Sequence, residues 1–280
     1  MYAPNPDPGN DWVTLTARAF RRLRAGGLHV SRYLSVGCGC GLDAIAAHRI
    51  FESSDLALVD LNAGLLGVAR ENVLCNCPTL KCADVAIEEA DILVGADGLG
   101  CFDLVYENLP NIPPGNAEPT GSQMATFQRR KRVGVPSGIA DVLLSSHYDF
   151  LQQAKRFLVP SGRVLSAIGA RVSWSSVQQM FVKSGYEPEL VAYEFKEQEE
   201  SGSVVGAYAA AETADRSFRF YDYDAATAAL ARRRADMDMG AVDALLPRPL
   251  TALESQRRLA EGQRIGHMVF LVAGTPVAAS

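Results

Sequence analysis

An alternating glycine motif at residues 37–41, Gly-Cys-Gly-Cys-Gly, directly follows the apolar stretch 33–36. Glycine lets a ligand approach the backbone closely and tolerates the positive φ values that a tight turn requires. A dinucleotide-binding turn carries its third glycine one position later, where this chain has Leu42. The next apolar stretch ends at Asp60, whose carboxylate is purely a hydrogen-bond acceptor. These residues predict a ligand site over a strand-to-helix turn.

A second group of residues that could take part in chemistry follows the apolar stretch 102–106. It reads Glu107-Asn108-Leu109-Pro110-Asn111. In an open α/β sheet, ligands bind beyond the carboxyl ends of the strands, which is where this group is expected. Glu107 is suited to bind a cation or to accept a proton. An ion pair with the basic run 129–132 explains Glu107 about equally well. Pro110 fixes φ and stiffens the turn.

The elements that must position these groups alternate between apolar and helix-forming stretches, which predicts an α/β fold with a parallel sheet and helices on both faces. Strands are expected at residues 33–36, 56–59, 79–82, 102–106, 163–168, 190–195 and 267–272. Helices are expected at residues 42–51, 62–74, 141–158, 173–183 and 225–237.

The expected parts of the chain are an N-terminal helical segment at 1–29, a core at 30–200, an insertion at 201–262, and a final strand with a tail at 263–280. The loop at 113–138 is rich in Pro, Gly, Ser and Arg, and so long a loop is usually functional or mobile. The insertion carries the aromatic residues Phe218, Tyr221 and Tyr223, which we expect in the wall of a capped pocket.

Composition narrows the class of protein. The 280 residues carry a formal net charge of −5, and 48% are hydrophobic, as in soluble globular proteins. No signal peptide or membrane-spanning stretch is visible, so we expect a cytoplasmic protein with reduced cysteines. The pairs Cys38/Cys40 and Cys75/Cys77 are spaced more closely than zinc ligands usually are, so no metal is expected. The acidic charge does not favour a nucleic-acid partner.

The glycine motif and Asp60 together resemble the class I S-adenosylmethionine-dependent methyltransferases. The resemblance implies a Rossmann-like seven-stranded sheet and S-adenosyl-L-methionine as the cofactor. It also implies that Gly37, Gly39 and Gly41 form the floor under the cofactor. Asp60 would accept hydrogen bonds from the ribose hydroxyls, with Leu61 beside it in the cofactor site.

Three further positions follow from this resemblance. Asp84, placed after the expected third strand, matches the acidic residue that binds the adenine amino group. Asn108 is expected to touch both the cofactor and the methyl acceptor. Ser35 stands two positions before the first glycine, where the family usually carries an acid that orders the loop and the cofactor amine.

The segment Asn108-Leu109-Pro110-Asn111 resembles the Asn-Pro-Pro-Tyr motif of amino- and amide-directed methyltransferases, and residues 154–169 are similar to the release-factor glutamine methyltransferase catalytic domain. The matches cover about residues 30–195. In that group the Asn oxygen and the next carbonyl accept hydrogen bonds from the acceptor NH₂, so Asn108, Glu107 and Pro110 are the expected catalytic residues. Asn111 replaces the aromatic that stacks on a flat acceptor, which disfavours a nucleobase or protein glutamine.

The sequence therefore predicts methylation of a nitrogen in a small molecule, amino-acid-like or a secondary-metabolite intermediate. Leu109, Asn111, Tyr221 and Tyr223 are expected to contact this acceptor. The alternatives are methylation of a protein glutamine or an RNA base, S- or O-methylation of a small molecule, and a non-catalytic cofactor-binding subunit. The aromatic residues of the insertion would equally suit a homodimer in which they cover the partner's pocket.

Overall fold

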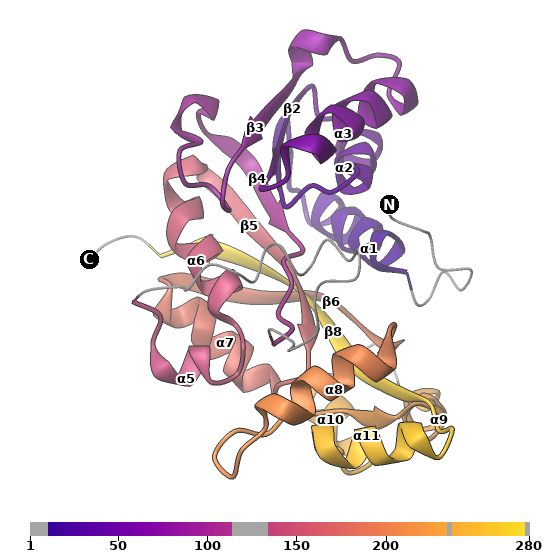
Figure 1. The fold of residues 1–280 in the computed structure, drawn as a ribbon. Helices are drawn as coiled ribbons and strands as arrows, with labels where there is room; N and C mark the ends of the chain where they lie inside the picture. Colours follow the sequence, from indigo (N-terminus) through magenta and orange to yellow (C-terminus); the bar gives the residue numbers. More distant parts are fainter. Residues whose placement is uncertain (1–10, 114–133, 234–236, 278–280) are drawn as a thin grey trace.

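A twisted sheet forms the centre of the molecule (Figure 1), seen in a computed structural model that describes residues 11–113, 134–233 and 237–277. The strand order is β3-β2-β1-β4-β5-β8-β6, and β7 pairs with the start of β8. Neighbours from β3 to β5 are parallel, whereas β8 runs antiparallel to both β5 and β6. The strands are β1 Arg32–Val36, β2 Asp55–Asp60, β3 Val85–Glu89, β4 Phe102–Glu107, β5 Leu158–Ala170, β6 Tyr186–Glu197, β7 Tyr221–Asp222 and β8 Ile265–Pro276.

Helices cover both faces of this sheet, and the expected Rossmann-like α/β class is confirmed. Several helices begin at a side chain that accepts a hydrogen bond from a backbone N–H of the first turn, among them Asn62 before α3 and Ser173 before α7. The helices are α1 Trp12–Ala25, α2 Leu42–Phe51, α3 Ala63–Asn76, α5 Ser137–Ala140, α6 Ser145–Ala154, α7 Trp174–Lys183, α8 Ser201–Ala211, α9 Tyr223–Leu230, α10 Met239–Leu245 and α11 Ala252–Ala260.

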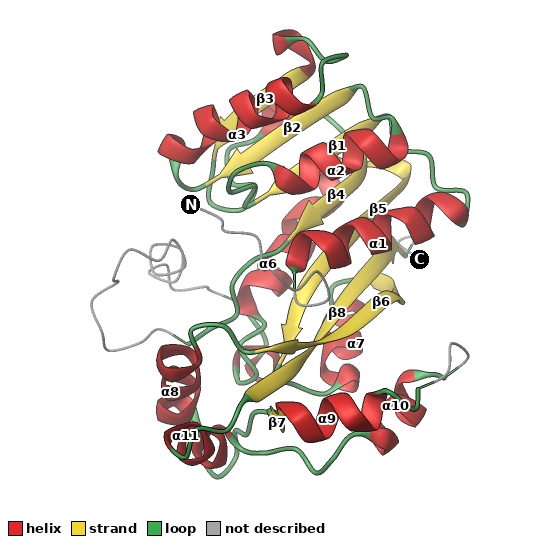
Figure 2. Ribbon diagram, turned by 90° about the vertical axis from the view of Figure 1, so that its right-hand side faces the viewer, coloured by secondary structure: helices red, strands yellow, loops and turns green. Residues whose placement is uncertain are grey.

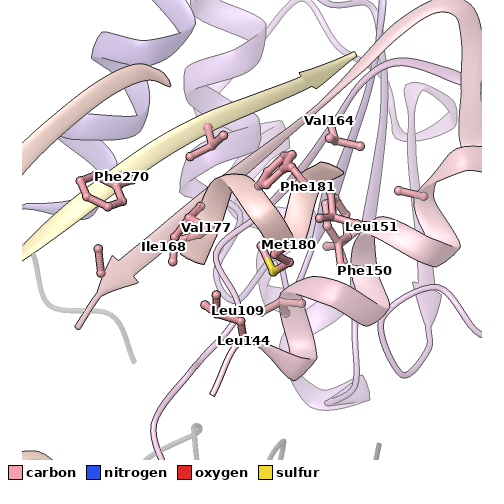
Figure 3. Close-up of a cluster of buried hydrophobic side chains, with 14 of the residues drawn as sticks. Leu109, Leu144, Phe150, Leu151, Val164, Ile168, Val177, Met180, Phe181 and Phe270 are labelled. Carbon is pink, nitrogen blue, oxygen red and sulfur yellow. The ribbon is translucent and has the colours of Figure 1, made fainter. Parts of the chain in front are cut away.

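Alternate residues of each strand pack on opposite faces, which divides the core in two. Tyr33 of β1 packs with α1, α2 and α3, the helices along the near face of the sheet in Figure 2. Leu34, the next residue, packs on the other face with α5, α6 and α7. Figure 3 shows part of this second cluster, where Leu109 lies beside Leu144 and Met180.

The N-terminal helix α1 belongs to the first of these clusters. Phe20 is fully buried, and its ring lies 5.8 Å from that of Tyr33 and 5.7 Å from that of Tyr106, both at edge-to-face angles. Thr16 and Tyr106 share a buried hydrogen bond of 2.8 Å. These contacts fix α1 against β1 and β4, and so fix the place of Trp12 at its start.

Three predicted elements were wrong in their bounds. The third strand is Val85–Glu89 rather than 79–82, because a short turn at Cys82–Asp84 precedes it. The strand expected at 163–168 starts earlier, at Leu158, because residues 158–162 continue β5 across a register shift with β4. The helix expected at 141–158 starts only at Ser145, because Leu143 has a φ of 60°, which an α-helix does not allow.

The segment between β6 and β8 forms a small helical layer. Helices α8 and α11 lie side by side beyond the ends of β6 and β8 (Figures 1 and 2). They enclose a separate buried cluster that includes Val205, Tyr208, Phe218 and Phe220. The helix expected at 225–237 is shorter than predicted, since α9 ends at Leu230.

Candidate functional site

The turn between β1 and α2 has the backbone geometry that its glycines suggest. Gly37, Gly39 and Gly41 have φ values of 69°, 52° and 80°. A Cβ on Gly41 would lie 3.0 Å from the Ala69 carbonyl oxygen, so glycine there lets α3 approach the turn. A Cβ on Gly39 would meet no atom within 4 Å. The turn is therefore closed below by α3 and open above Gly39.

Asp60 lies next to this turn, at the carboxyl end of β2. Val59 pairs in register with Val36, and the Val59 carbonyl oxygen accepts hydrogen bonds from the backbone N–H groups of Gly37 and Cys38. The Asp60 carboxylate accepts from the Gly39 N–H at 3.0 Å and from the Asn62 N–H at 2.9 Å. Asp60 thus braces the open part of the turn, and the half-buried Leu61 follows it.

A second carboxylate, Asp43, supports the same turn from the first residues of α2. Tyr33 donates a hydrogen bond to Asp43 at 2.6 Å, and the Ser35 hydroxyl also hydrogen-bonds to it. Burial raises the pKa of Asp43, and these two hydrogen bonds oppose the rise. Asp43 thus brings a carboxylate next to Ser35, the position where the resemblance would place an acid. The sequence signal for it was an acid two residues after Gly41.

Asp84 lies away from the turn. It was expected to bind adenine because it was placed after the third strand, and this placement is wrong. It precedes β3 instead of following it, and its carboxylate accepts from the backbone N–H of Lys81 at 2.7 Å. It lines a hollow at the opposite edge of the sheet, with residues that precede β2 such as Glu52. The acid that follows β3 is Asp91, which is 7% exposed. The neighbouring Ala90 N–H donates to the Asp60 carbonyl oxygen at 3.1 Å, so Asp91 lies at the glycine edge.

Glu107 ends β4 at the same edge, since it pairs in register with Val36. It is fully buried, and His147 of α6 lies 2.8 Å from one of its carboxylate oxygens. The other oxygen accepts from the Leu109 N–H at 2.7 Å. Within the described part of the chain, His147 is the side chain that hydrogen-bonds to the Glu107 carboxylate. The expected alternative partner, the basic run 129–132, lies outside the described residues.

The four residues after Glu107 have distinct surroundings. Asn108 is exposed, and its side chain has no hydrogen-bond partner among the described residues. Leu109 is 5% exposed and packs in the core below the turn, where its Cδ2 lies 3.0 Å from where a Cβ of Gly37 would be. Pro110 is half-buried. Asn111 donates to the Gly169 carbonyl oxygen at 2.8 Å and so ties the segment to β5.

A cavity of about 340 Å³ opens beside this segment. Asn108, Leu109, Pro110 and Asn111 all line it, together with residues from the ends of β5 and β6, the start of β8, and α1 and α8. Sequence reasoning missed the titratable side chains of this cavity. They are Arg171, Lys196 and His267 at its inner wall, with Glu197, Glu199 and Glu200.

Tyr221 and Tyr223 do not line this cavity. Tyr221 is 1% exposed, and its ring packs edge-on against Phe195 at 6.1 Å. Tyr223 stacks on the same Phe195 ring at 5.6 Å. Phe218 is buried against Tyr208 at 4.7 Å. Tyr221 and Tyr223 thus hold the helical layer against β6, whereas Phe218 packs within the layer. The insertion reaches the cavity through Val204 of α8.

Two other expectations concern metals and membranes. Over the residues that the structure describes, no group of three or more His, Cys, Asp and Glu side chains is arranged to hold a metal ion. Cys38 is buried, and burial raises the pKa of its thiol. In the same described ranges, no helix has the length and apolar character needed to cross a bilayer.

No protein-family model and no curated protein sequence matches this chain. Solved structures with a similar fold include a ribosomal protein L11 methylase from Lactobacillus delbrueckii subsp. bulgaricus, with 18% identity, a TM-score of 0.42, and coverage of 62% of this chain and 69% of that one. A precorrin-6y C5,15-methyltransferase from Geobacter metallireducens has 11% identity, a TM-score of 0.48, and coverage of 99% and 94%. The YcgJ protein from Bacillus subtilis has 12% identity, a TM-score of 0.48, and coverage of 94% and 99%. At these identities the similarity concerns the fold alone.

Proposed function

We propose that the protein is an S-adenosylmethionine-dependent methyltransferase that methylates a nitrogen of a small molecule. The observation that carries the proposal is the open glycine turn after β1, braced at the Gly39 N–H by the carboxylate of Asp60. It lies at the same sheet edge as Asn108, since Val36 pairs with Glu107 in register. A cofactor site and an acceptor site would thus adjoin each other.

The residues at this edge fit the cofactor. The space above Gly39 admits a ligand against the backbone, and a side chain there would fill it. Asp60 would accept hydrogen bonds from the ribose hydroxyls, and Asp91 from the adenine amino group, because a carboxylate accepts without donating. When bound, S-adenosylmethionine supplies an electrophilic methyl group on a positively charged sulfur.

Asn108 is the residue best placed to hold the acceptor. Its side chain is exposed to the cavity and has no described partner, so its amide oxygen is available to an N–H of the acceptor. Pro110 and the Asn111–Gly169 hydrogen bond restrict the segment that carries it. Such fixed positioning is a main source of rate in a transfer between two bound molecules. The cavity volume of about 340 Å³ suits a small acceptor.

In this proposal Glu107 does not contact the acceptor but holds the neighbouring backbone in place. Both of its oxygens are occupied, by His147 and by the Leu109 N–H, so it fixes the backbone that follows Asn108. We also propose that α8 caps the cavity, since Val204 is its contribution to the lining. Tyr221 and Tyr223 have no part in acceptor binding here.

Calorimetric titration with S-adenosylmethionine and with S-adenosylhomocysteine tests the cofactor assignment. Wild type should bind both, and Asp60→Asn should weaken binding about tenfold or more, because the hydrogen bonds from the sugar lose a charged acceptor. Asp84→Asn is the matched control. It neutralises a carboxylate at the opposite edge of the sheet and should leave both affinities unchanged.

The outcomes separate the alternatives. No binding by folded wild type would refute the proposal. Binding that Asp84→Asn weakens and Asp60→Asn does not would place the cofactor elsewhere. Binding without methyl transfer to any amine, thiol, hydroxyl, peptide or RNA acceptor would leave a non-catalytic cofactor-binding subunit.

A further inference from the structure

The inner wall of the cavity carries a buried lysine whose positive charge is only weakly compensated by nearby carboxylates. Lys196, near the end of β6, is 1% exposed, and its ammonium has no hydrogen-bond partner in the described structure. The nearest carboxylate oxygen, from Glu199, lies 3.6 Å away, beyond a good hydrogen bond. The Trp12 ring lies under the ammonium at 4.7 Å. An ammonium has three donors, and here none of them is satisfied by a described side chain or carbonyl.

A second buried cation, Arg171, adjoins the same wall. It is 5% exposed, and its guanidinium donates to the Gln198 side chain at 2.6 Å and lies 2.9 Å from the ring nitrogen of His267. Its longer contacts are with Asn111 at 3.3 Å and with the Gly169 carbonyl oxygen at 3.4 Å. All of these acceptors are neutral, so the charge of Arg171 has no ionic partner among the described residues.

These groups make the floor of the cavity electropositive. Burial, the field of Arg171 and the field of Lys196 all lower the pKa of His267 well below its usual value, which leaves that ring neutral. The carboxylates of the cavity lie farther out, where the side chains of Glu197 and Glu199 are 38% and 56% exposed. Among the described residues Arg171 has no ionic partner, and Lys196 has the partly exposed Glu199 at 3.6 Å. Buried charges that are poorly paired are costly, so two such cations beside an open cavity indicate an anionic ligand.

We propose that this floor binds a carboxylate of the methyl acceptor, with Lys196 as the direct donor and Arg171 as a fixed positive charge behind it. This rests on the proposed function, and it narrows the acceptor to a small amino or imino acid. The carboxylate would bind at Lys196 and the nitrogen at Asn108, which line one cavity. A single negative charge fits better than a phosphate, because the outer glutamates would repel a second charge.

Titration of the protein with paired probes tests the inference. Glycine, acetate and benzoate are compared with glycinamide, acetamide and benzamide, which have similar shapes and no carboxylate. Each titration is done with and without saturating S-adenosylhomocysteine. The carboxylates should bind more tightly than their amides. Lys196→Gln should weaken carboxylate binding roughly ten- to hundredfold, the value of a hydrogen bond to a charged group, and leave the amides unaffected.

Two variants control for structural effects. Lys196→Arg keeps the charge and should restore most of the binding, whereas Lys183→Gln removes an exposed lysine of α7 and should change nothing. Equal affinity for carboxylates and amides, equal carboxylate binding by wild type and Lys196→Gln, or a preference for inorganic phosphate would overturn the inference. Binding of S-adenosylhomocysteine without carboxylate binding would refute this inference alone. Carboxylate binding without S-adenosylhomocysteine binding would refute the methyltransferase proposal and keep the carboxylate site.

Discussion

Replacing Lys196 with methionine should remove a charge that the fold tolerates poorly, and the effect should depend on pH. Burial lowers the pKa of Lys196 from 10.5 to about 8, Arg171 adds to this, and Glu199 and Asp11 partly oppose it. The unfolded chain keeps the ordinary lysine value of about 10.4. Between these two values the unfolded state binds the proton and the folded state does not. The free energy of unfolding of wild type therefore rises with pH across that window.

The size of the effect follows from the fall in pKa. Each tenfold change in proton affinity is worth about 1.4 kcal/mol, so a fall from 10.5 to about 8 corresponds to about 3 kcal/mol. The Lys196 side chain is 2% exposed, so solvent screens little of it. Methionine has a similar length and no charge. The quantity to compare is the free energy of unfolding of Lys196→Met minus that of wild type. This difference should be about 3 kcal/mol larger below pH 8 than at pH 10.5.

Urea unfolding followed by tryptophan fluorescence, in the presence of a reductant, measures this difference. Wild type and Lys196→Met are compared at several pH values from about 7 to about 10.5. Groups that titrate in both proteins cancel in the difference. Lys183→Met, at an exposed site, should give a difference that does not vary with pH. A Lys196→Met difference that is equally constant would show that Lys196 is solvated or paired in the native state, and the reasoning on the cavity floor would fail.

Two further predictions follow from the glycine turn and from His267. Gly41→Ala should lower the free energy of unfolding more than Gly39→Ala, because both incur about 1–2 kcal/mol for a left-handed residue and only Gly41 also meets Ala69, at 3.0 Å. Gly39→Ala should be the variant that loses S-adenosylhomocysteine binding, and equal behaviour in urea unfolding and calorimetry would contradict the geometry. In the unfolded chain His267 becomes protonated near pH 6.5, whereas the buried ring of the folded protein stays neutral. The free energy of unfolding should therefore fall by up to about 1.4 kcal/mol per pH unit as the pH drops below that value. His267→Gln should remove this slope in acid urea titrations, and a slope that persists would assign it to other groups.

The glycine turn and its carboxylate were predictable from sequence because their signals are local. Three glycines in five residues after an apolar stretch, and an acid at the end of the next, define a turn whatever the rest of the chain does. The strand β3 was misplaced because it is an edge strand with a half-exposed pattern, and its last two residues are glutamates. That error moved the acid expected after the third strand from Asp91 to Asp84.

The floor of the cavity could not be predicted, because its residues come from distant parts of the chain. Arg171 follows β5, Lys196 lies in β6 and His267 in β8, and only the sheet order brings them together. In sequence, a single lysine in a strand suggests a solvent-facing position. The prediction that Tyr221 and Tyr223 line the pocket was wrong because the packing partner of these rings is distant in sequence. Aromatic residues in an insertion suggest a pocket wall, but here Phe195 supplies a surface for them to pack on.

The place of β8 in the sheet has a consequence for how the chain is made. The last strand in sequence, Ile265–Pro276, lies between β5 and β6 and is the strand neighbour of β6 in the sheet. During synthesis, β5 and β6 therefore keep unpaired edges until the residues of β8 have left the ribosome. The glycine turn and Asp60 form from residues made early, whereas the wall with Lys196, Arg171 and His267 is assembled last. A nascent chain would thus complete the glycine turn well before the cavity wall.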